Sequence, residues 1–324
     1  MLAIGSPRKL PAVWLHIVKS TRTIRTMTST TASAIPQADL ESFRTHLNSS
    51  SRILTLCGAG LSAASGLPTF RGAGGYWRAY DAMSLATPEA FSADPSLVWQ
   101  FYNYRRHMAL KASPNAAHYA LAELARKKPE SLVISQNVDG FHIRADHPRK
   151  SLELLHGSLF TVKCTDFYCD HVDAENFQDP ISPALAFEED QDISSAEVPL
   201  KDVDIKDLPK CPKCKTALIR LGVVWFGESL PVLAMERIED WMSDKRGIDL
   251  LIVIGTSAQV YPAAGYIMSA RSKGARVAVV NPERPDQEAS RLQKGDWFFQ
   301  GDAAVIVPEI LGSVTGRVAT STKF

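Results

Sequence analysis

A glycine-rich loop directly follows an apolar run near the start of the chain. Gly58-Ala59-Gly60 comes after Ile53–Cys57, and Ser62 stands two residues further on. Glycine lets the backbone turn tightly and approach a phosphate, and a helix that follows would offer its first amides to the anion. The spacing Gly58-x-Gly60-x-x-Ala63 also satisfies the loose dinucleotide fingerprint. The loop therefore predicts a dinucleotide site, with a plain strand-to-helix turn as the alternative.

Four of the five cysteines form two close pairs, Cys164 with Cys169 and Cys211 with Cys214. One tetrahedral ion can take two thiolates from each pair. A site closed by four thiolates leaves no position for water, so we expect a structural zinc ion and not a Lewis acid. The fifth cysteine, Cys57, ends an apolar run and is predicted to be a buried core residue.

Two further polar groups follow apolar runs. Gln136-Asn137-Val138-Asp139 comes after Leu132–Ile134, and His156 comes after Leu152–Leu155 and before Gly157. A single histidine is more often a structural residue than a base. Its place beside glycine at the end of an apolar run, in a chain with the other loops, favours a catalytic role for His156.

A second glycine-rich loop, Leu67–Trp77, contains aromatic residues, and no second strand follows at the distance that an ordinary dehydrogenase requires. We expect a flexible lid over a cofactor, with a plain surface loop as the alternative. The residues able to stack or pair there are Phe70, Arg71, Tyr76 and Trp77.

The segment Val223-Val224-Trp225-Phe226-Gly227-Glu228 is aromatic and β-branched. Such a run is suited to pair with an extended peptide as an added strand. A simple edge strand is the alternative.

The elements that must position these residues belong to an α/β fold. Amphipathic stretches such as His118–Lys127 and Pro262–Lys273 separate short apolar runs, which indicates a doubly wound parallel sheet. Ligands bind at the carboxyl edge of such a sheet, so the polar loops are expected to converge on one crevice. The four predicted strands are Ile53–Cys57, Leu132–Ile134, Leu250–Ile254 and Val277–Val280.

An acidic stretch at residues 178–209 lies between the cysteine pairs and contains prolines. This composition predicts a mobile surface insertion outside the core.

Composition and charge exclude several classes of protein. The chain has 324 residues, 45% hydrophobic and 22% charged, which is typical of a globular protein. A net charge of +1 does not supply the positive field that nonspecific nucleic-acid binding requires. The longest uncharged run, Leu250–Ala270, is interrupted by polar residues and Pro262, so no membrane span is expected.

Residues 1–38 contain five basic side chains and no acidic one, and are rich in Ser and Thr. They predict a mitochondrial presequence, with a disordered basic tail as the alternative. Translation from Met27 would give a shorter form located in the cytosol or nucleus.

Together these motifs resemble those of the sirtuin family, NAD-dependent protein-lysine deacylases, from about Asp39 to Pro308. The residues that carry the resemblance occur in the family's order: Gly58-Ala59-Gly60 with Ser62, Thr69-Phe70-Arg71, Gln136-Asn137-Val138-Asp139, His156-Gly157, the four paired cysteines, Trp225-Phe226-Gly227-Glu228 and Gly255-Thr256-Ser257.

The resemblance implies a deacylase domain over residues 39–315 and a tail at 316–324. Its Rossmann-like large domain would comprise 39–71, 113–160 and 222–310, and a smaller zinc-binding module 72–112 and 161–221. Acyl-lysine peptides would enter between them, and we expect a monomer.

The resemblance also implies the roles of individual residues. His156 would be the general base on the ribose hydroxyls, with Asn137 as the second catalytic residue, and Phe70 would shield the reactive carbon from water. The NAD-binding residues would be Gly58, Ala59, Gly60, Ser62, Phe70, Arg71, Tyr76, Trp77, Gln136, Asn137, Val138, Asp139, Gly255, Thr256, Ser257, Asn281, Pro282, Glu283 and Ala303. The substrate-binding residues would be Ala86, Tyr102, Arg105, Val224, Trp225, Phe226, Gly227 and Glu228, and the zinc ligands Cys164, Cys169, Cys211 and Cys214.

Within the family, Tyr102 and Arg105 resemble the class that removes succinyl, malonyl and glutaryl groups, and Ala86 matches its widened acyl pocket. Asp94-Pro95 is a good helix start, and a buried stripe would place Tyr102 and Arg105 together on a neighbouring face. Arginine binds a carboxylate bidentately, and an acetyl group offers no such partner. The stripe is predicted at Leu97, Phe101, Tyr104 and Met108.

The sequence motifs are also compatible with other functions. An ordinary deacetylase and a mono-ADP-ribosyltransferase would use the same motifs. A hydride-transferring dehydrogenase and a zinc-ribbon nucleic-acid module are the more distant alternatives, and the near-zero net charge argues against the second of these.

Overall fold

The computed structural model of the chain describes residues 35–69, 75–188, 191–284 and 292–318. Residues from Ile35 onward form one compact unit, and the expected presequence lies almost wholly outside the described residues. None of the helices in the described part of the chain combines the length and the apolar character that a membrane crossing requires.

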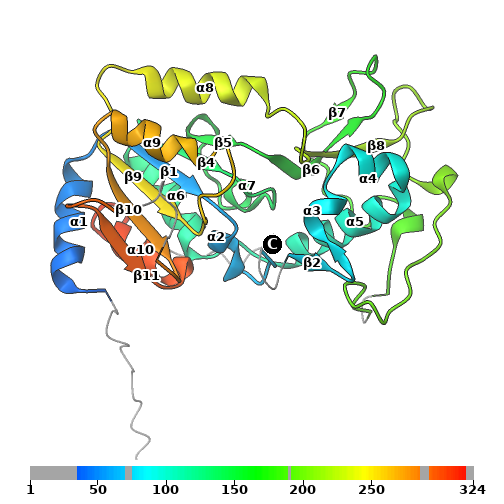
Figure 1. The fold of residues 1–324 in the computed structure, drawn as a ribbon, viewed down its shortest axis with the longest axis horizontal. Helices are drawn as coiled ribbons and strands as arrows, with labels where there is room; N and C mark the ends of the chain where they lie inside the picture. The colour runs from blue at the N-terminus through cyan, green and yellow to red at the C-terminus, as the bar shows by residue number, and fades with distance from the viewer. Residues whose placement is uncertain (1–34, 70–74, 189–190, 285–291, 319–324) are drawn as a thin grey trace, which may run out of the picture. The chain divides into compact units, whose positions relative to one another are not determined.

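A six-stranded parallel sheet forms the centre of the large domain, in the order β11-β10-β9-β1-β4-β5 (Figure 1). The α/β class is therefore confirmed, as are the four predicted strands. The strands β5 and β11 are additional. The strands are β1 (Ile53–Cys57), β4 (Leu132–Ser135), β5 (Leu152–Leu154), β9 (Leu250–Ile254), β10 (Arg276–Asn281) and β11 (Trp297–Gln300).

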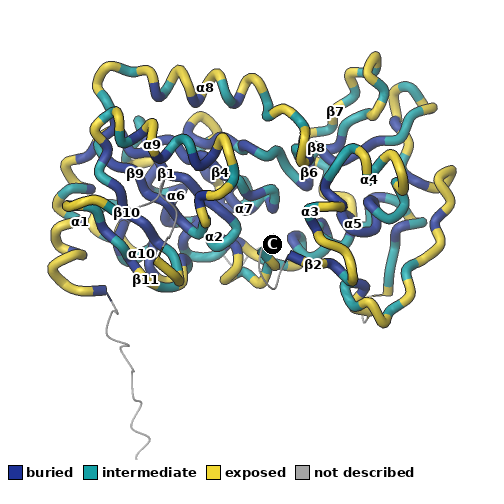
Figure 2. Tube along the Cα trace, viewed as in Figure 1, coloured by how far each residue is buried: buried dark blue, intermediate teal, exposed yellow. Residues whose placement is uncertain are grey.

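Helices cover both faces of this sheet, because alternate strand residues point to opposite sides. Ile53 and Cys57 pack in one apolar cluster with α1, α6 and α10, whereas Leu54 and Leu56 pack in another with α8 and α9. Figure 2 shows these strands as buried and the outer side of α8 as exposed. The helices are α1 (Gln37–Ser49), α2 (Gly60–Ala63), α6 (Ala116–Lys127), α7 (Phe141–Arg144), α8 (Val232–Ser243), α9 (Gly265–Ser272) and α10 (Ala303–Thr315).

A third apolar cluster belongs to the smaller module, where a three-stranded antiparallel sheet of order β7-β6-β8 packs against α5. The elements are β2 (Tyr76–Trp77), β3 (Tyr80–Asp81), α3 (Ala82–Leu85), α4 (Pro88–Ala93), α5 (Pro95–Lys111), β6 (Gly157–Cys164), β7 (Val172–Asp173), β8 (Ile219–Val223) and the short 3₁₀ helices η2 (Arg149–Ser151), η3 (Pro183–Leu185) and η4 (Ile205–Asp207).

Helix α5 begins where the sequence predicts, since Pro95 is its first residue and the Asp94 carboxylate accepts the Leu97 amide at 2.9 Å. The predicted buried stripe is wrong except at Phe101. Leu97, Tyr104 and Met108 are only half-buried, while every residue from Val98 to Asn103 is buried. The helix is covered on more than one side, so a one-sided apolar stripe does not describe it.

The acidic stretch packs against α5 and buries its other side. This packing corrects the expectation of an insertion outside the core. Ile181, Leu185 and Ile193 are buried in the small-module cluster. The buried Arg106 guanidinium on α5 donates to the carbonyls of Asn176 and Gln178, each at 2.9 Å. The acidic residues that the structure describes between Glu188 and Asp207 are exposed, whereas the apolar side chains of the stretch complete the core.

Three buried histidines lie in a row beside α6 and α7. His118 and His142 have ring centroids 5.3 Å apart, and His142 and His147 5.6 Å. Neither ring nitrogen of His142 has a hydrogen-bond partner among the described residues. Burial lowers the pKa of His118 to about 3 and that of His147 to about 4, and lowers that of His142 well below the ordinary value.

These three imidazoles predict a loss of stability in acid. The unfolded chain binds protons below pH ~6.5 while the folded chain does not, so each imidazole that stays neutral costs about 2 kcal/mol at pH 5. We expect the thermal midpoint to fall between pH 7 and pH 5, and to fall less in His142→Phe. An equal fall in both proteins would show that His142 does not contribute. Differential scanning fluorimetry over this range is the measurement.

Candidate active site

The carboxyl ends of the six strands lie side by side at one edge of the sheet. Because the strand order is β11-β10-β9-β1-β4-β5, the polar segments follow one another along this edge from Ala303 to His156. Gln136 Nε2 donates to Thr256 Oγ1 at 3.3 Å, so the loops after β4 and β9 touch across β1. The expected convergence of these loops is thus observed. Their order along the edge is Ala303, Asn281 to Glu283, Gly255 to Ser257, Gly58 to Gly60, Gln136 to Asp139 and His156.

The glycines after β1 leave room for the neighbouring loop after β9. A Cβ on Gly58 would lie 2.6 Å from the Thr256 Cβ, and one on Gly60 would lie 2.6 Å from the Gly255 Cα. The α2 helix has only four residues, and the amides of Leu61 to Ala63 already donate to Gly58 and Ala59 carbonyls. The glycines therefore allow two strand-end loops to pack together, and these helix amides are not free for an anion.

Asn137, Asp139 and Ser62 form a buried polar cluster between β1 and β4. Asn137 Nδ2 donates to the Gly58 carbonyl at 2.9 Å, and the Ser62 hydroxyl donates to Asp139 Oδ2 at 2.7 Å. Burial raises the pKa of Asp139, although the Phe141 amide and Ser62 both donate to its carboxylate and oppose the shift. These side chains are held rigidly at the strand ends, as a sugar-binding site requires.

His156 lies at the end of β5, half-buried. Its Nδ1 lies 3.0 Å from the Gln136 carbonyl oxygen. A carbonyl can only accept, so Nδ1 carries the proton and Nε2 keeps a lone pair. Burial lowers the pKa of His156, partly offset by this hydrogen bond. The imidazole is thus neutral and oriented as a base.

The second glycine-rich loop is only partly described. Phe70 and Arg71 lie outside the described residues, and Tyr76 is exposed. Trp77 is buried in the small-module cluster with its ring 5.5 Å from that of Phe101. Its packing there corrects the expectation that it contacts the cofactor.

The other end of the edge, away from His156, is formed by the loops after β10 and β11. Pro282, Glu283 and Ser257 are exposed, and Asn281 is half-buried. Ala303 is the first residue of α10 and is buried in the core of the large domain. The Ala303 side chain therefore serves packing, and only its backbone borders the edge.

Strand β8 ends at Val223, so the segment Val224–Glu228 is not an edge strand, and its pairing with an extended peptide stays a prediction. The Val224 amide donates to the His156 carbonyl and the Phe226 amide to the Ala86 carbonyl, both at 2.9 Å. The segment thus connects the strand-end edge to α3 of the small module.

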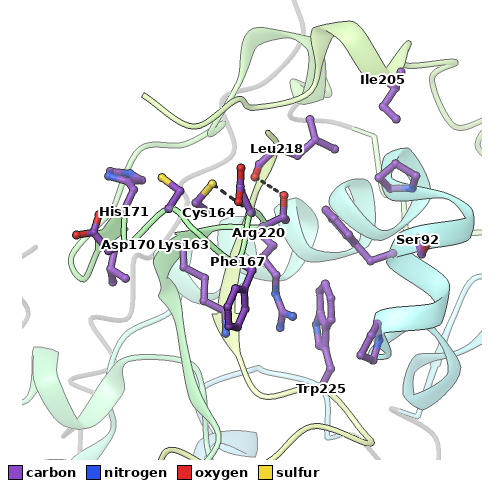
Figure 3. Close-up of a pocket in the computed structure, with 17 residues that line it drawn as sticks. Ser92, Lys163, Cys164, Phe167, Asp170, His171, Ile205, Leu218, Arg220 and Trp225 are labelled. Carbon is purple, nitrogen blue, oxygen red and sulfur yellow. Dashed lines mark hydrogen bonds between the residues drawn. The ribbon is translucent and has the colours of Figure 1, made fainter. Parts of the chain in front are cut away.

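Glu228 holds this segment in shape through hydrogen bonds within the chain. Its carboxylate receives two hydrogen bonds from Arg220, at 2.5 and 2.9 Å, and one from the Trp225 amide at 2.9 Å. The Arg220 guanidinium also lies 3.3 Å from the centre of the Trp225 ring, and both side chains line a pocket of about 650 Å³ beside the cysteine pairs (Figure 3). Arg220 could not be predicted from the sequence, since a single basic residue in a strand carries no signal of its partner.

Tyr102, Arg105 and Ala86 belong to the small module near Trp225. Tyr102 is buried with its ring 6.3 Å from that of Trp225, and Arg105 is half-buried with its guanidinium 5.6 Å from the Phe101 ring. Ala86 is buried, and its carbonyl accepts the Phe226 amide. The structure therefore brings the two expected acyl-binding side chains to the module that faces the Val224–Glu228 segment.

The four paired cysteines converge on one point. Their sulfur atoms all lie within 4.8 Å of one another, with Cys164 and Cys214 3.8 Å apart and Cys169 and Cys211 3.6 Å apart. Four thiolates at ~2.3 Å from a tetrahedral zinc ion would be about 3.8 Å apart. The cluster fits zinc, and it lies at the loops of the small module away from His156.

Comparison with known proteins matches residues 58–262 to the Sir2 family. An NAD-dependent protein deacylase of Candida albicans is 43% identical over 303 residues, covering 86% of this chain and 99% of its own. The dog protein named NAD-dependent protein deacylase sirtuin-5, mitochondrial, is 40% identical, covering 89% of this chain and 90% of its own. A solved Sir2 homologue in complex with NAD superposes with a TM-score of 0.67 at 35% identity, covering 87% of this chain and 94% of its own.

The cysteine cluster predicts one zinc ion per chain that stabilises the small module. Cys211→Ser should lose the ion and lower the thermal midpoint, because a structural zinc contributes directly to folding. Mass spectrometry for metals, combined with fluorimetry, measures both. The control Cys57→Ala removes a thiol that lies in the core of the large domain, and should keep the ion. Full zinc content in Cys211→Ser would refute the site.

Proposed function

The chain belongs to the Sir2 family, and we propose that it is an NAD-dependent protein-lysine deacylase that removes succinyl, malonyl and glutaryl groups. Free nicotinamide and O-acyl-ADP-ribose would be the other products. The observation that carries the acyl preference is the pairing of Tyr102 and Arg105 on α5, beside Trp225.

Tyr102 and Arg105 suit a carboxylate at the end of an acyl chain. Burial raises the pKa of Tyr102, with Arg105 opposing the shift, so the hydroxyl remains a donor. Burial lowers the pKa of Arg105, and an anion would offset that loss of solvation. Ala86 takes little space where the segment Val224–Glu228 meets α3, which supports a wide acyl pocket.

The strand-end edge suits NAD as the second substrate. The close-packed glycines keep side chains off the middle of the edge, and the buried Asn137 and Asp139 offer an amide and a carboxylate to ribose hydroxyls and a carboxamide. NAD would supply a sugar carbon from which nicotinamide can leave. His156 lies at the same end of the edge as these two residues, because β5 is the neighbour of β4.

His156 would act as the general base on a ribose hydroxyl. Its Nδ1 proton is committed to the Gln136 carbonyl, so only Nε2 can receive a proton. General base catalysis is typically worth ~10²- to 10⁴-fold in rate.

The same proposal extends to location and partners. Relatives such as the dog and zebrafish proteins are named mitochondrial, and residues 1–38 have the composition of a presequence. We propose a mitochondrial, monomeric enzyme that acts on acyl-lysine peptides and carries one structural zinc ion.

The acyl preference predicts a selective effect of Arg105→Met. A charge-assisted contact worth ~1.5 to 3 kcal/mol corresponds to a loss of roughly 10- to 150-fold in desuccinylation. Deacetylation should be unchanged, because acetyl offers no carboxylate. Mass spectrometry of matched succinyl- and acetyl-lysine peptides with NAD measures both rates, and Lys111→Met at the exposed end of α5 is the control.

A wild-type preference for acetyl would reject the carboxylate contact and leave an ordinary deacetylase. Transfer of labelled ADP-ribose to protein without loss of either acyl group would instead indicate a mono-ADP-ribosyltransferase.

The lowered pKa of His156 predicts how the rate depends on pH. The base works when neutral, so kcat/KM should stay constant as the pH falls through 6.5, and decline only at lower pH. His156→Asn should lose nearly all activity at every pH. An acidic limb centred above pH 6.5 would contradict the lowered pKa.

A further inference from the structure

Helix α5 presents two opposite faces, and only one of them faces the proposed acyl site. An α-helix turns about 100° per residue, so Ser96, Gln100, Asn103 and His107 fall within a sector of about 60°. By the same geometry, Tyr102 and Arg105 lie on the far side of the helix.

The acidic stretch contacts the face of α5 that carries Ser96, Gln100, Asn103 and His107, from one end of that face to the other. We call residues 178–188 and 191–208 the strap. Each of the four polar side chains on this face makes a hydrogen bond to it: Ser96 Oγ to the Val203 carbonyl at 2.5 Å, Gln100 Nε2 to the Lys201 carbonyl at 3.2 Å, Asn103 Nδ2 to the Leu185 carbonyl at 3.0 Å, and His107 Nδ1 to the Asp179 carboxylate at 2.7 Å.

Apolar contacts accompany these bonds. Phe187 of the strap lies with its ring 4.9 Å from that of His107 and 6.4 Å from that of Tyr104. Leu185 and Val203 are buried in the same cluster as Tyr102. The strap is therefore fixed to α5 by hydrogen bonds at four positions, about one helical turn apart, and by apolar contacts beside them.

Asn103 is the most deeply placed of the four side chains. It is 1% exposed, donates to the Leu185 carbonyl, and accepts the Ile181 amide at 3.4 Å. It directly follows Tyr102 in the sequence, so a shift of the Asn103 backbone also moves Tyr102. Losing this contact would leave the Leu185 carbonyl and the Ile181 amide without their partner on α5, which favours a shift between the strap and the helix.

We propose that the strap is a specificity device: it sets the position of α5 so that Tyr102 and Arg105 meet a carboxylate, and Asn103 is its main positioning residue. This inference rests on the proposed function. A bidentate contact requires exact placement of both partners, whereas an acetyl group makes no contact that depends on Arg105. Loosening the strap should therefore lower desuccinylation and spare deacetylation.

The test compares both acyl substrates on the same variant. In Asn103→Leu, which keeps the number and branching of the side-chain heavy atoms and removes the hydrogen bonds, kcat/KM for a succinyl-lysine peptide should fall about tenfold or more. The value for the matched acetyl-lysine peptide should change less than about twofold, because the strand-end residues are untouched. Gln100→Met is the milder second variant, for use if Asn103→Leu does not fold.

Arg78→Gln is the matched control. Arg78 also donates to strap carbonyls, those of Ile193 at 3.0 Å and Ala196 at 3.2 Å, but it belongs to the β2–β3 turn and not to α5. Its loss should lower the thermal midpoint without changing the ratio of succinyl to acetyl activity.

The outcomes separate this inference from the proposed function. A wild-type enzyme without preference for succinyl would reject the proposed acyl class. A wild type that prefers succinyl, with Asn103→Leu and Gln100→Met lowering both activities equally or neither, would reject the strap's role alone.

Discussion

The close packing of the Gly58–Gly60 loop on Gly255 and Thr256 is the contact on which the rest of the site depends. Two parallel neighbours, β1 and β9, end at the same level, and a side chain at either glycine would collide with the next loop. Because these loops touch, Gln136 can reach Thr256 and Asn137 can reach the Gly58 carbonyl. The polar side chains of Gln136 and Asn137 are thus positioned by contacts between the loops in the middle of the sheet.

A second constraint joins the large domain to the small module. The segment from Val224 to Phe226 gives one amide to the His156 carbonyl and another to the Ala86 carbonyl. Glu228 and Arg220 keep this segment from straightening, since the carboxylate binds both the guanidinium and the Trp225 amide. The three consecutive residues Val224 to Phe226 therefore link His156 to Ala86 of the proposed acyl pocket. The expected path of the peptide runs along the same residues.

Local signals in the sequence predicted the parts of this arrangement that are local. Apolar runs followed by glycine or polar residues identified β1, β4, β9 and β10, and the cysteine spacing identified the cluster of four sulfurs. The strands β5 and β11 were missed although a glycine follows each of them closely, because Glu153 interrupts the apolar residues of β5 and the apolar residues of β11 are aromatic and not aliphatic. Contacts that depend on the path of the folded backbone left no signal: the Arg220–Glu228 pair and the burial of Trp77 in the small-module core both follow from tertiary packing. Acidic composition misled the interpretation of residues 178–209, because it reports on side chains and says nothing of what the backbone carbonyls bind.

The contacts between α5 and the acidic stretch have a consequence for how the sequence can change over time. In three of the four polar contacts the helix supplies the side chain and the stretch supplies only a backbone carbonyl. Every amino acid carries that carbonyl, so most substitutions in the stretch preserve the contact, provided that its few buried apolar residues are kept. Selection for the geometry of the helix therefore acts on Ser96, Gln100 and Asn103, while the stretch that they hold can diverge until its ancestry is hard to recognise.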